Sequence, residues 1–243
     1  MTLLISLPES MAPRALSSAL LSLEPGLKIV TGHDNVQNTN EVEFAVVWNN
    51  YPEGLLLNYP NLKAISSYGH GVDGLLADRK LPEGVPLVRL KDDTMAGWMS
   101  EYLLAVVLLH RRQLLRHAEN SDFIEWGIAS RYHGNQLSIL GLGYLGQAAA
   151  KVFLKMRFDV SGWSRTLKKV EGVRSFSGND GLNEMLKNTN YLVNLLPLTL
   201  ETTDLLNTET LSKLKRGAYL INVGRGETLV EENLIPLLDE GQL

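Results

Sequence analysis

GLGYLG at residues 141–146 follows an apolar run, residues 136–140, and opens a segment rich in small and apolar residues, 145–157. A strand, a glycine-rich turn and a helix in this order are typical of a dinucleotide-binding βαβ unit. Gly141 would permit the tight turn, Gly143 would let the backbone approach a pyrophosphate, and Gly146 would let helix and strand pack closely. The pyrophosphate would lie at the helix N-terminus, where free N–H groups and the helix dipole favour an anion. A glycine-rich turn without a ligand is the alternative.

The next predicted strand, residues 159–163, indicates which dinucleotide would bind. It ends in Ser164, Arg165 and Thr166, and no carboxylate stands at its tip to accept a hydrogen bond from a ribose 2′-hydroxyl. A guanidinium can pair bidentately with a 2′-phosphate, and serine and threonine hydroxyls can donate to it. An ordinary solvated arginine at a strand end is the alternative. The pattern favours NADPH as the preferred cofactor, with NADH possible.

Strand-like and helix-like segments alternate along the whole chain, which is typical of parallel βαβ units. A polar segment at residues 91–94 precedes a long apolar-periodic helix predicted over residues 97–117. We therefore expect an α/β fold with a first domain over residues 1–96 and a second over residues 97–243. The expected strands are 2–7, 27–30, 44–48, 62–66, 86–90, 136–140, 159–163, 191–196 and 218–223, and the other expected helices are 11–23, 145–157, 180–187, 208–214 and 231–240.

The composition excludes several classes of protein. The 243 residues are 44% hydrophobic and 21% charged and include no cysteine, which excludes a disulfide scaffold and a cysteine-ligated metal site. A net charge of −4 without a basic stripe argues against a nucleic-acid partner. The longest apolar run, residues 102–109, is too short to span a membrane, and the first residues lack the basic region of a signal peptide. We expect a cytoplasmic protein that binds small molecules, without a metal.

Three spaced motifs, GLGYLG at 141–146, NLLPLT at 194–199 and NVGRGE at 222–227, resemble the D-isomer-specific 2-hydroxyacid dehydrogenases. Residues 157–176 are similar to the glyoxylate/hydroxypyruvate reductase A branch of that family. The resemblance covers the whole chain and implies two Rossmann-like domains with parallel sheets and an active site in the cleft between them. It also implies hydride transfer from the nicotinamide to C2 of a small 2-oxo acid, such as glyoxylate or hydroxypyruvate, and a homodimer formed with the help of helix 97–117.

The resemblance assigns the substrate contacts. Arg225 matches the family's catalytic arginine, whose fork of donors holds the substrate carboxylate and polarises the ketone. Gly69, His70 and Gly71 match the loop whose backbone N–H groups receive that carboxylate. A plain strand-to-helix turn is the alternative for this loop, and His70 is not expected to be the acid/base. Trp48 is expected either to wall the substrate pocket or to lie in a core or domain interface.

The resemblance also assigns further cofactor contacts. Leu196 and Pro197 would lie against the nicotinamide, and Thr202 would contact the cofactor ribose. The complete set of expected cofactor-binding residues is Gly141, Gly143, Tyr144, Leu145, Gly146, Ser164, Arg165, Thr166, Leu196, Pro197, Thr202, Val223 and Gly224.

The sequence departs from the family pattern downstream of Arg225. The family has a glutamate and a histidine there, whereas the five histidines of this chain, at positions 33, 70, 110, 117 and 133, all precede Arg225. One interpretation is a C-terminally incomplete NADPH-dependent reductase, whose first domain lacks its C-terminal return and whose second lacks its last strand or strands. The alternative is a catalytically incomplete NADP(H)-binding protein that acts as a binding or interaction module. Another Rossmann enzyme, such as an amino-acid dehydrogenase, would leave the motif around Arg225 accidental.

Overall fold

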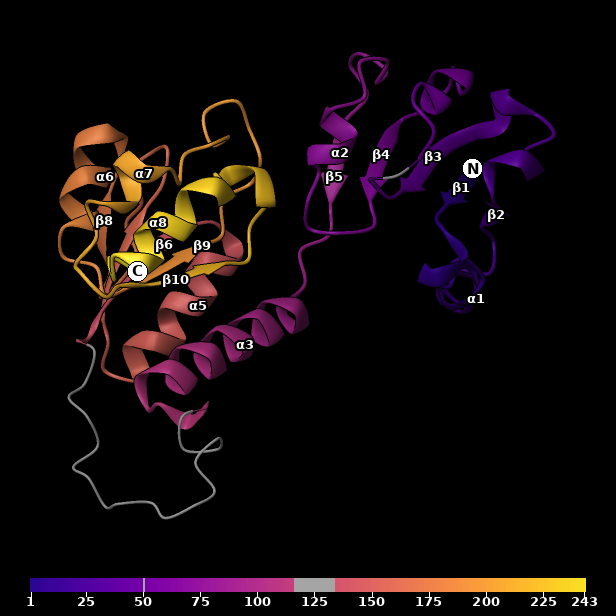
Figure 1. Ribbon diagram of the computed structural model, residues 1–243. Coiled ribbons are helices and arrows are strands. Elements are labelled where there is room, and N and C mark those ends of the chain that lie inside the picture. Colours follow the sequence, from indigo (N-terminus) through magenta and orange to yellow (C-terminus); the bar gives the residue numbers. More distant parts are fainter. Residues whose placement is uncertain (50, 116–133) are drawn as a thin grey trace. The chain divides into compact units, whose positions relative to one another are not determined.

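The computed structural model describes residues 1–49, 51–115 and 134–243 and divides the chain into two compact units (Figure 1). The first unit is Met1–Lys91 and the second is Asp92–Leu243. The division falls inside the polar segment 91–94, whereas the expected boundary between residues 96 and 97 lies within α3 (Asp93–Arg111). α3 begins this early because the Asp92 side chain accepts a hydrogen bond from the Thr94 N–H, which caps the helix.

The first unit is built around a sheet of five parallel strands in the order β2-β1-β3-β4-β5 (Figure 1). Each strand lies within about two residues of the expected one, because apolar residues and turn residues delimit these segments locally. The elements are β1 (Thr2–Ser6), η1 (Glu9–Met11), α1 (Pro13–Leu23), β2 (Lys28–Thr31), η2 (His33–Asn35), η3 (Thr39–Glu41), β3 (Val42–Val47), η4 (Leu55–Asn58), β4 (Ala64–Ser67), α2 (Asp73–Leu76) and β5 (Leu87–Arg89).

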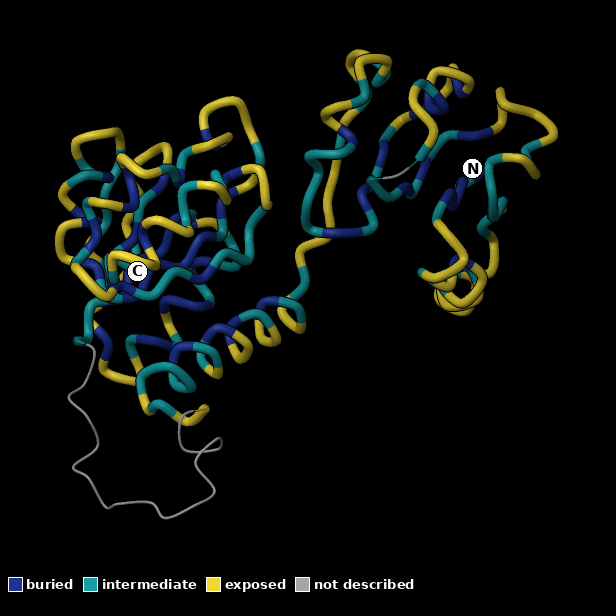
Figure 2. The backbone as a smooth tube through the Cα atoms, in the orientation of Figure 1, coloured by how far each residue is buried: buried dark blue, intermediate teal, exposed yellow. Residues whose placement is uncertain are grey.

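One face of this sheet forms the core of the first unit (Figure 2). Leu4, Ala45 and Ile65 stand side by side in register on neighbouring strands, and all three are buried. Leu56 and Leu75, from η4 and α2, are also fully buried in the same cluster. Burial of these side chains is worth about 1.5–3 kcal/mol each and holds the strand-end loops over β3 and β4 in place.

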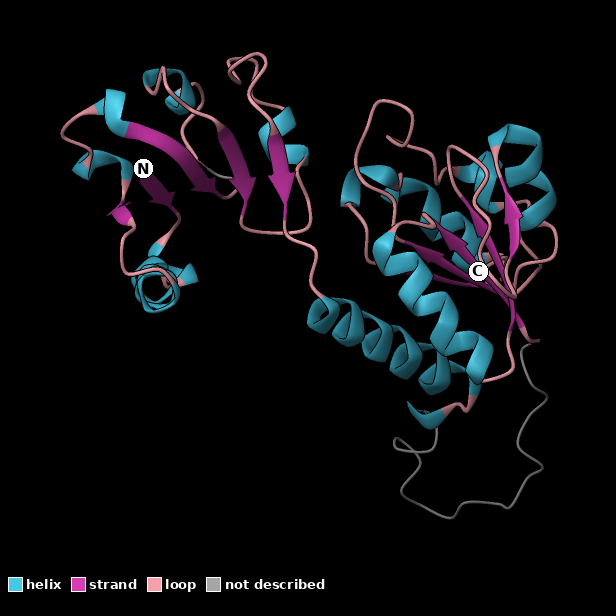
Figure 3. Cartoon of the chain, turned by 180° about the vertical axis from the view of Figure 1, so that it is seen from behind, coloured by secondary structure: helices cyan, strands magenta, loops and turns pink. Residues whose placement is uncertain are grey.

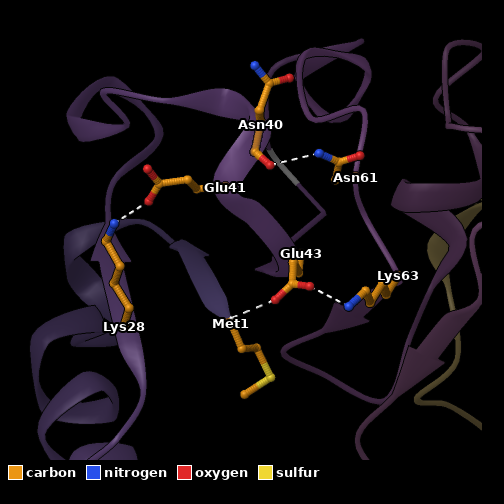
Figure 4. A network of polar contacts seen from close by, with 7 residues as sticks. All are labelled: Met1, Lys28, Asn40, Glu41, Glu43, Asn61 and Lys63. Atoms are coloured by element: carbon orange, nitrogen blue, oxygen red, sulfur yellow. Dashed lines mark hydrogen bonds and ion pairs between the residues drawn. The ribbon is translucent and has the colours of Figure 1, made fainter.

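Ion pairs join the amino-terminal ends of the strands in the first unit (Figure 4). Glu43 pairs with Lys63 and with the amino group of Met1, and Glu41 pairs with Lys28. The hydrogen bond from Lys63 holds the pKa of the Glu43 carboxyl below its usual value. Glu43 is half-buried, whereas its partners and the pair of Glu41 with Lys28 are exposed, so each pair contributes little to stability.

The second unit contains a second sheet of five parallel strands, in the order β10-β9-β6-β7-β8, with helices on both faces (Figure 3). α3 and α5 pack on one face, and α6, α7 and α8 pack on the other. The elements after α3 are β6 (Gln136–Leu140), α5 (Tyr144–Lys155), β7 (Asp159–Trp163), β8 (Arg174–Phe176), α6 (Gly178–Leu186), β9 (Tyr191–Asn194), α7 (Thr208–Leu211), β10 (Tyr219–Asn222), η5 (Gly226–Thr228), η6 (Glu231–Asn233) and α8 (Leu234–Asp239).

The doubly wound α/β architecture expected from the sequence is confirmed, with differences at the ends of elements. β8 was not expected, because a three-residue edge strand is too short for its alternation to stand out. α3 ends at Arg111, and residues 116 and 117 of the predicted helix lie outside the described residues, as does His133. Within the described ranges, no helix has the length and apolar character needed to cross a membrane.

A cluster of aromatic rings surrounds Tyr191 at the start of β9. The ring centroids of His110, Phe158 and Tyr219 lie 5.8, 6.1 and 6.3 Å from that of Tyr191, each in an edge-to-face arrangement. Tyr191 is fully buried, which raises the pKa of its hydroxyl, and this hydroxyl has no hydrogen-bond partner among the described residues. The ring stabilises the core, whereas its polar oxygen does not.

We expect Tyr191→Phe to leave the free energy of unfolding unchanged or to raise it by about 1 kcal/mol, because it removes a buried hydroxyl that has no hydrogen-bond partner among the described residues. Tyr191→Ala, the control, should lower it by about 3–5 kcal/mol by removing the ring. Chemical denaturation of the three proteins measures both changes. A loss of stability in the phenylalanine variant comparable to that in the alanine variant would show that the hydroxyl is satisfied.

Candidate cofactor and substrate site

The GLGYLG segment turns from β6 into α5 as the spacing of its glycines predicts. Gly141 has a φ of +100°, in the region that side chains disfavour, and a Cβ atom on it would lie 3.0 Å from the carbonyl oxygen of Leu195. A Cβ atom on Gly146 would overlap the carbonyl oxygen of Gly141. Both positions therefore require glycine for steric reasons, and together they bring the start of α5 close to the end of β6.

Gly143 differs from these two glycines because it faces open space. It is exposed, and no atom lies within 4 Å of the position that a Cβ would take. Gly143 is also the N-cap of α5, and because it has no side chain it makes no capping hydrogen bond to the first N–H groups of the helix. The first turn of α5 therefore presents backbone N–H groups and the positive end of the helix dipole beside an open space, which fits a phosphate group.

Leu142 anchors the loop to the sheet. Its side chain is fully buried against Gly162 of β7, where any Cβ would overlap it. On the outer side, Tyr144 donates a hydrogen bond to Asp93 at the start of α3, and this bond raises the pKa of the tyrosine hydroxyl. Leu145 is half-buried in the first turn of α5. The loop is therefore held on both sides while Gly143 stays open.

Ser164, Arg165 and Thr166 follow β7 and lie beside this loop. Ser164 is 8% exposed, and its hydroxyl donates to the carbonyl oxygen of Thr166 at 2.8 Å. Its hydroxyl hydrogen therefore holds the turn, and Arg165 and Thr166 are the exposed side chains of the segment. A hydrogen bond involving the Thr199 hydroxyl lowers the pKa of Glu201, and the positive charge of Arg165 adds to this lowering.

In the loop after β9, two of the three expected cofactor residues are buried in the protein. Leu196 is 6% exposed and belongs to the core cluster beneath α6 and α7, whereas Pro197 is exposed. Thr202 is 7% exposed; its hydroxyl donates to the Pro197 carbonyl at 2.6 Å and accepts from the Thr199 N–H at 2.8 Å. The Thr202 side chain therefore closes the loop over residues 197–202.

Arg225 follows β10 and is half-buried. The Val223 N–H donates to the Asn194 carbonyl at 3.1 Å, and a Cβ atom on Gly224 would lie only 2.8 Å from the Leu196 carbonyl oxygen. The loop before Arg225 is thus pressed against the loop after β9. The backbone that carries Arg225 is thereby held just outside the carboxyl end of a strand, where ligands bind in open α/β sheets, and the guanidinium donates to the Gly224 carbonyl at 3.2 Å.

The first unit places Trp48, Gly69, His70 and Gly71 at the carboxyl ends of β3 and β4. The Ser67 hydroxyl donates to the Gly71 carbonyl at 2.9 Å and accepts from the Gly69 N–H at 3.2 Å. A Cβ on Gly69 would overlap the ring of Trp48, so the tryptophan lies directly against this loop. The Gly69 N–H is therefore used within the loop, and the His70 ring Nδ1 lies 3.2 Å from the Leu90 carbonyl oxygen.

The structure gathers the expected residues into two sets, one in each unit. The cofactor set and Arg225 lie in four loops at the carboxyl ends of β6, β7, β9 and β10. β6 lies between β7 and β9, so these loops meet where the order of the strands reverses, the place where nucleotides bind in doubly wound sheets. Three polar residues whose hydrogen bonds organise these loops were not predicted as site residues from the sequence: Asn194 and Thr228, which are fully buried, and Asn222, which is half-buried. Across the described part of the chain, no group of three or more acidic or histidine side chains could hold a metal ion.

Comparison with known proteins agrees with this architecture. Residues 104–243 match the family "D-isomer specific 2-hydroxyacid dehydrogenase, NAD binding domain". A glyoxylate/hydroxypyruvate reductase A from Serratia proteamaculans is 38% identical over 83% of this chain and 66% of its own length. One from Yersinia enterocolitica is 35% identical over 85% of this chain and 68% of its own length. The chain thus spans about two thirds of the length of these curated relatives.

Solved structures show the same relationship. A D-isomer-specific 2-hydroxyacid dehydrogenase from Xanthobacter autotrophicus Py2, in complex with NADPH and MES, has a TM-score of 0.92 and 36% identity. An NADPH-dependent glyoxylate/hydroxypyruvate reductase from Sinorhizobium meliloti, in complex with NADP and sulfate, has a TM-score of 0.87 and 32% identity. Both comparisons cover 100% of this chain and 78% of the other.

The fold, the glycine-rich turn after β6 and these matches define the class of protein: the chain belongs to the D-isomer-specific 2-hydroxyacid dehydrogenase family. Within that family, the curated relatives place it in the glyoxylate/hydroxypyruvate reductase A branch.

Gly143 and Gly146, at the N-terminus of α5, differ in the space around them, which gives a prediction for stability. Gly146→Ala should lower the free energy of unfolding by about 1–3 kcal/mol, because the new methyl group overlaps the Gly141 carbonyl and forces the backbone to move. Gly143→Ala, the matched control, places its methyl in open space and should change stability by less than about 0.5 kcal/mol. Thermal and denaturant unfolding of both variants checks this. Equal losses would mean that close packing at residue 146 is not what selects glycine.

Proposed function

We propose that this chain binds NADPH and contributes to the reduction of small 2-oxo acids, such as glyoxylate and hydroxypyruvate, to 2-hydroxy acids. The observation that carries the proposal is the open first turn of α5 beside the exposed Arg165. The names of the relatives from Serratia and Yersinia, and the nucleotides bound by the two solved relatives, point the same way.

The phosphates of the cofactor are assigned to two places in the second unit. The N–H groups at the start of α5 would bind the pyrophosphate, with Gly143 leaving room for it. Arg165 would pair with the 2′-phosphate that distinguishes NADPH from NADH. Thr166 is exposed next to it and would donate a further hydrogen bond, whereas Ser164 would shape the turn. The bound cofactor would supply the hydride to C2 of the 2-oxo acid, and the oxygen of the resulting alkoxide would take up a proton from water.

The remaining chemistry is assigned to groups that bind an anion. Arg225 would hold the substrate carboxylate and stabilise the negative charge that develops on the ketone oxygen. In the first unit, the backbone N–H groups of His70 and Gly71 would bind the carboxylate of the substrate. The Trp48 ring, which lies against this loop, would form an apolar wall beside that carboxylate. Pro197, which is exposed after β9, would contact the nicotinamide.

Two further expectations belong to this proposal. α3 carries Trp98 and Tyr102, which are 67% and 55% exposed, and we propose that they contribute to a homodimer. A cytoplasmic location fits an enzyme that draws on the cellular NADPH pool.

Arg165→Glu should weaken NADPH binding by about 10- to 100-fold, because it replaces a charge-assisted hydrogen bond by repulsion, and should leave NADH binding nearly unchanged. Fluorescence titration of each nucleotide with the purified variant measures both dissociation constants. Gly143→Ala provides the control: its methyl group enters the expected phosphate space and should weaken both nucleotides alike. An unchanged ratio of the two constants in Arg165→Glu would refute the 2′-phosphate assignment.

Arg225→Ala should reduce kcat/KM for glyoxylate by about 100- to 1,000-fold, because a donor to the developing oxyanion is lost, while NADPH affinity stays near the wild-type value. The kcat/KM of Arg225→Lys should lie between those of the wild type and Arg225→Ala, because lysine keeps the positive charge and loses the fork of donors. Oxidation of NADPH is followed by its absorbance. A kcat/KM that is the same in wild type and Arg225→Ala would remove Arg225 from the mechanism. NADPH binding by the wild-type chain with no oxidation by any 2-oxo acid would favour the binding module over the reductase.

A further inference from the structure

Asn194, the last residue of β9, joins the two loops that meet beside Arg225. Its side chain is fully buried, and its Nδ2 donates to the Thr228 hydroxyl at 2.7 Å and to Asn222 Oδ1 at 3.0 Å. Its Oδ1 accepts from the Leu196 N–H at 3.1 Å. Both amide hydrogens and one lone-pair site of the Asn194 side chain are therefore used, so its orientation is fixed.

Thr228 passes this constraint to the backbone of Arg225. It too is fully buried, and its hydroxyl, which accepts from Asn194, donates to the carbonyl oxygen of Arg225 at 2.6 Å. Asn222 Nδ2 donates to the same carbonyl at 3.3 Å, and its Oδ1 accepts from the Gly224 N–H at 3.1 Å. The peptide that follows the Arg225 Cα is thus tied by its carbonyl to Thr228 and Asn222, and the peptide between Val223 and Gly224 is tied by its N–H to Asn222.

The hydrogen bonds of Asn194 and Thr228 fix the direction of their partners, whereas the fold needs only side chains that fill the buried space. An apolar side chain at residue 194 or 228 would also fill the buried space. At residue 228 it would remove the 2.6 Å hydrogen bond to the carbonyl of Arg225 and leave that carbonyl with the longer bonds from the Thr228 N–H, at 3.2 Å, and from Asn222 Nδ2, at 3.3 Å. At residue 194 it would remove the donor that orients the Thr228 hydroxyl. Buried polar groups are costly unless every partner is present, and when satisfied they select one geometry. The network therefore connects the end of β9, which is followed by the loop with Leu196 and Pro197, to the backbone of Arg225.

We propose that Asn194 and Thr228 are positioning residues: through the carbonyl of Arg225 they set the direction of its guanidinium relative to the loop after β9. The inference rests on the proposed function of Arg225 as the group that binds the substrate carboxylate. Neither residue touches the reacting atoms in this assignment, and both act through the Arg225 backbone.

The test compares Thr228→Val, which keeps the shape and removes the hydroxyl, with Thr228→Ser, which keeps the hydroxyl. Thr228→Val should lower kcat/KM for glyoxylate by about 10- to 100-fold, the effect of misplacing a binding group by about 1 Å, with NADPH affinity unchanged. Thr228→Ser should restore most of the loss. In an Arg225→Ala background, Thr228→Val should cause no further loss. Equal losses in both backgrounds, or a parallel loss of NADPH affinity, would show a merely structural role.

A second readout separates this inference from the proposed function. The Nε–H resonance of Arg225, assigned by its disappearance in Arg225→Ala, reports the environment of the guanidinium without any turnover. Thr228→Val should shift or broaden this resonance, and Thr228→Ser should leave it in place; an unchanged resonance in the valine variant would overturn the positioning role even if the enzyme is active. A wild-type chain that reduces no 2-oxo acid would refute the proposed function and leave the resonance to decide the inference. If valine prevents folding, Thr228→Ala replaces it in both measurements.

Discussion

The parallel pairing of β6 with β7 on one side and with β9 on the other is the interaction on which the second unit depends. Backbone hydrogen bonds run from β6 to both neighbours along its length, so the chain must leave β6 in one direction for β7 and later return on the other side for β9. The loops that follow the three strands are then brought to one point of the sheet edge. Residues more than 50 positions apart in sequence, such as Gly141 and Leu195, approach to van der Waals contact there.

At this point of the sheet, three glycines lie so close to a backbone carbonyl or to a buried side chain that no Cβ atom would fit. Gly146 meets the Gly141 carbonyl, Gly162 meets Leu142, and Gly224 meets the Leu196 carbonyl. Gly143 is free of such contacts, and that difference separates the glycines required by packing from the one that faces open space, where we propose that the cofactor phosphates bind.

The polar side chains at the same edge divide in a similar way. Ser164, Thr202, Asn194 and Thr228 are nearly or fully buried, and their hydrogen bonds close turns or join loops. Arg165 is exposed, and Arg225 is half-buried on a tightly held backbone. The two charged side chains thus stand on a backbone held by neutral groups that are hydrogen-bonded within the protein, an arrangement that would need little reorganisation to bind the anions proposed above.

The sequence by itself determined the α/β class, most of the strands, the dinucleotide loop and the family resemblance, because these depend on local patterns: apolar periodicity, glycine spacing and turn residues. It did not reveal β8, whose three residues carry too little pattern, nor the start of α3, which the Asp92 cap moves forward. It also could not tell that the hydroxyls of Ser164 and Thr202 hold turns, or that Asn194 and Thr228 form one network. Asn194 and Thr228 are 34 positions apart, and only the pairing of β9 with β10 brings them together. The tertiary structure decided which polar groups are used within the protein, because hydrogen-bond partners from distant segments exist only once the sheet has formed.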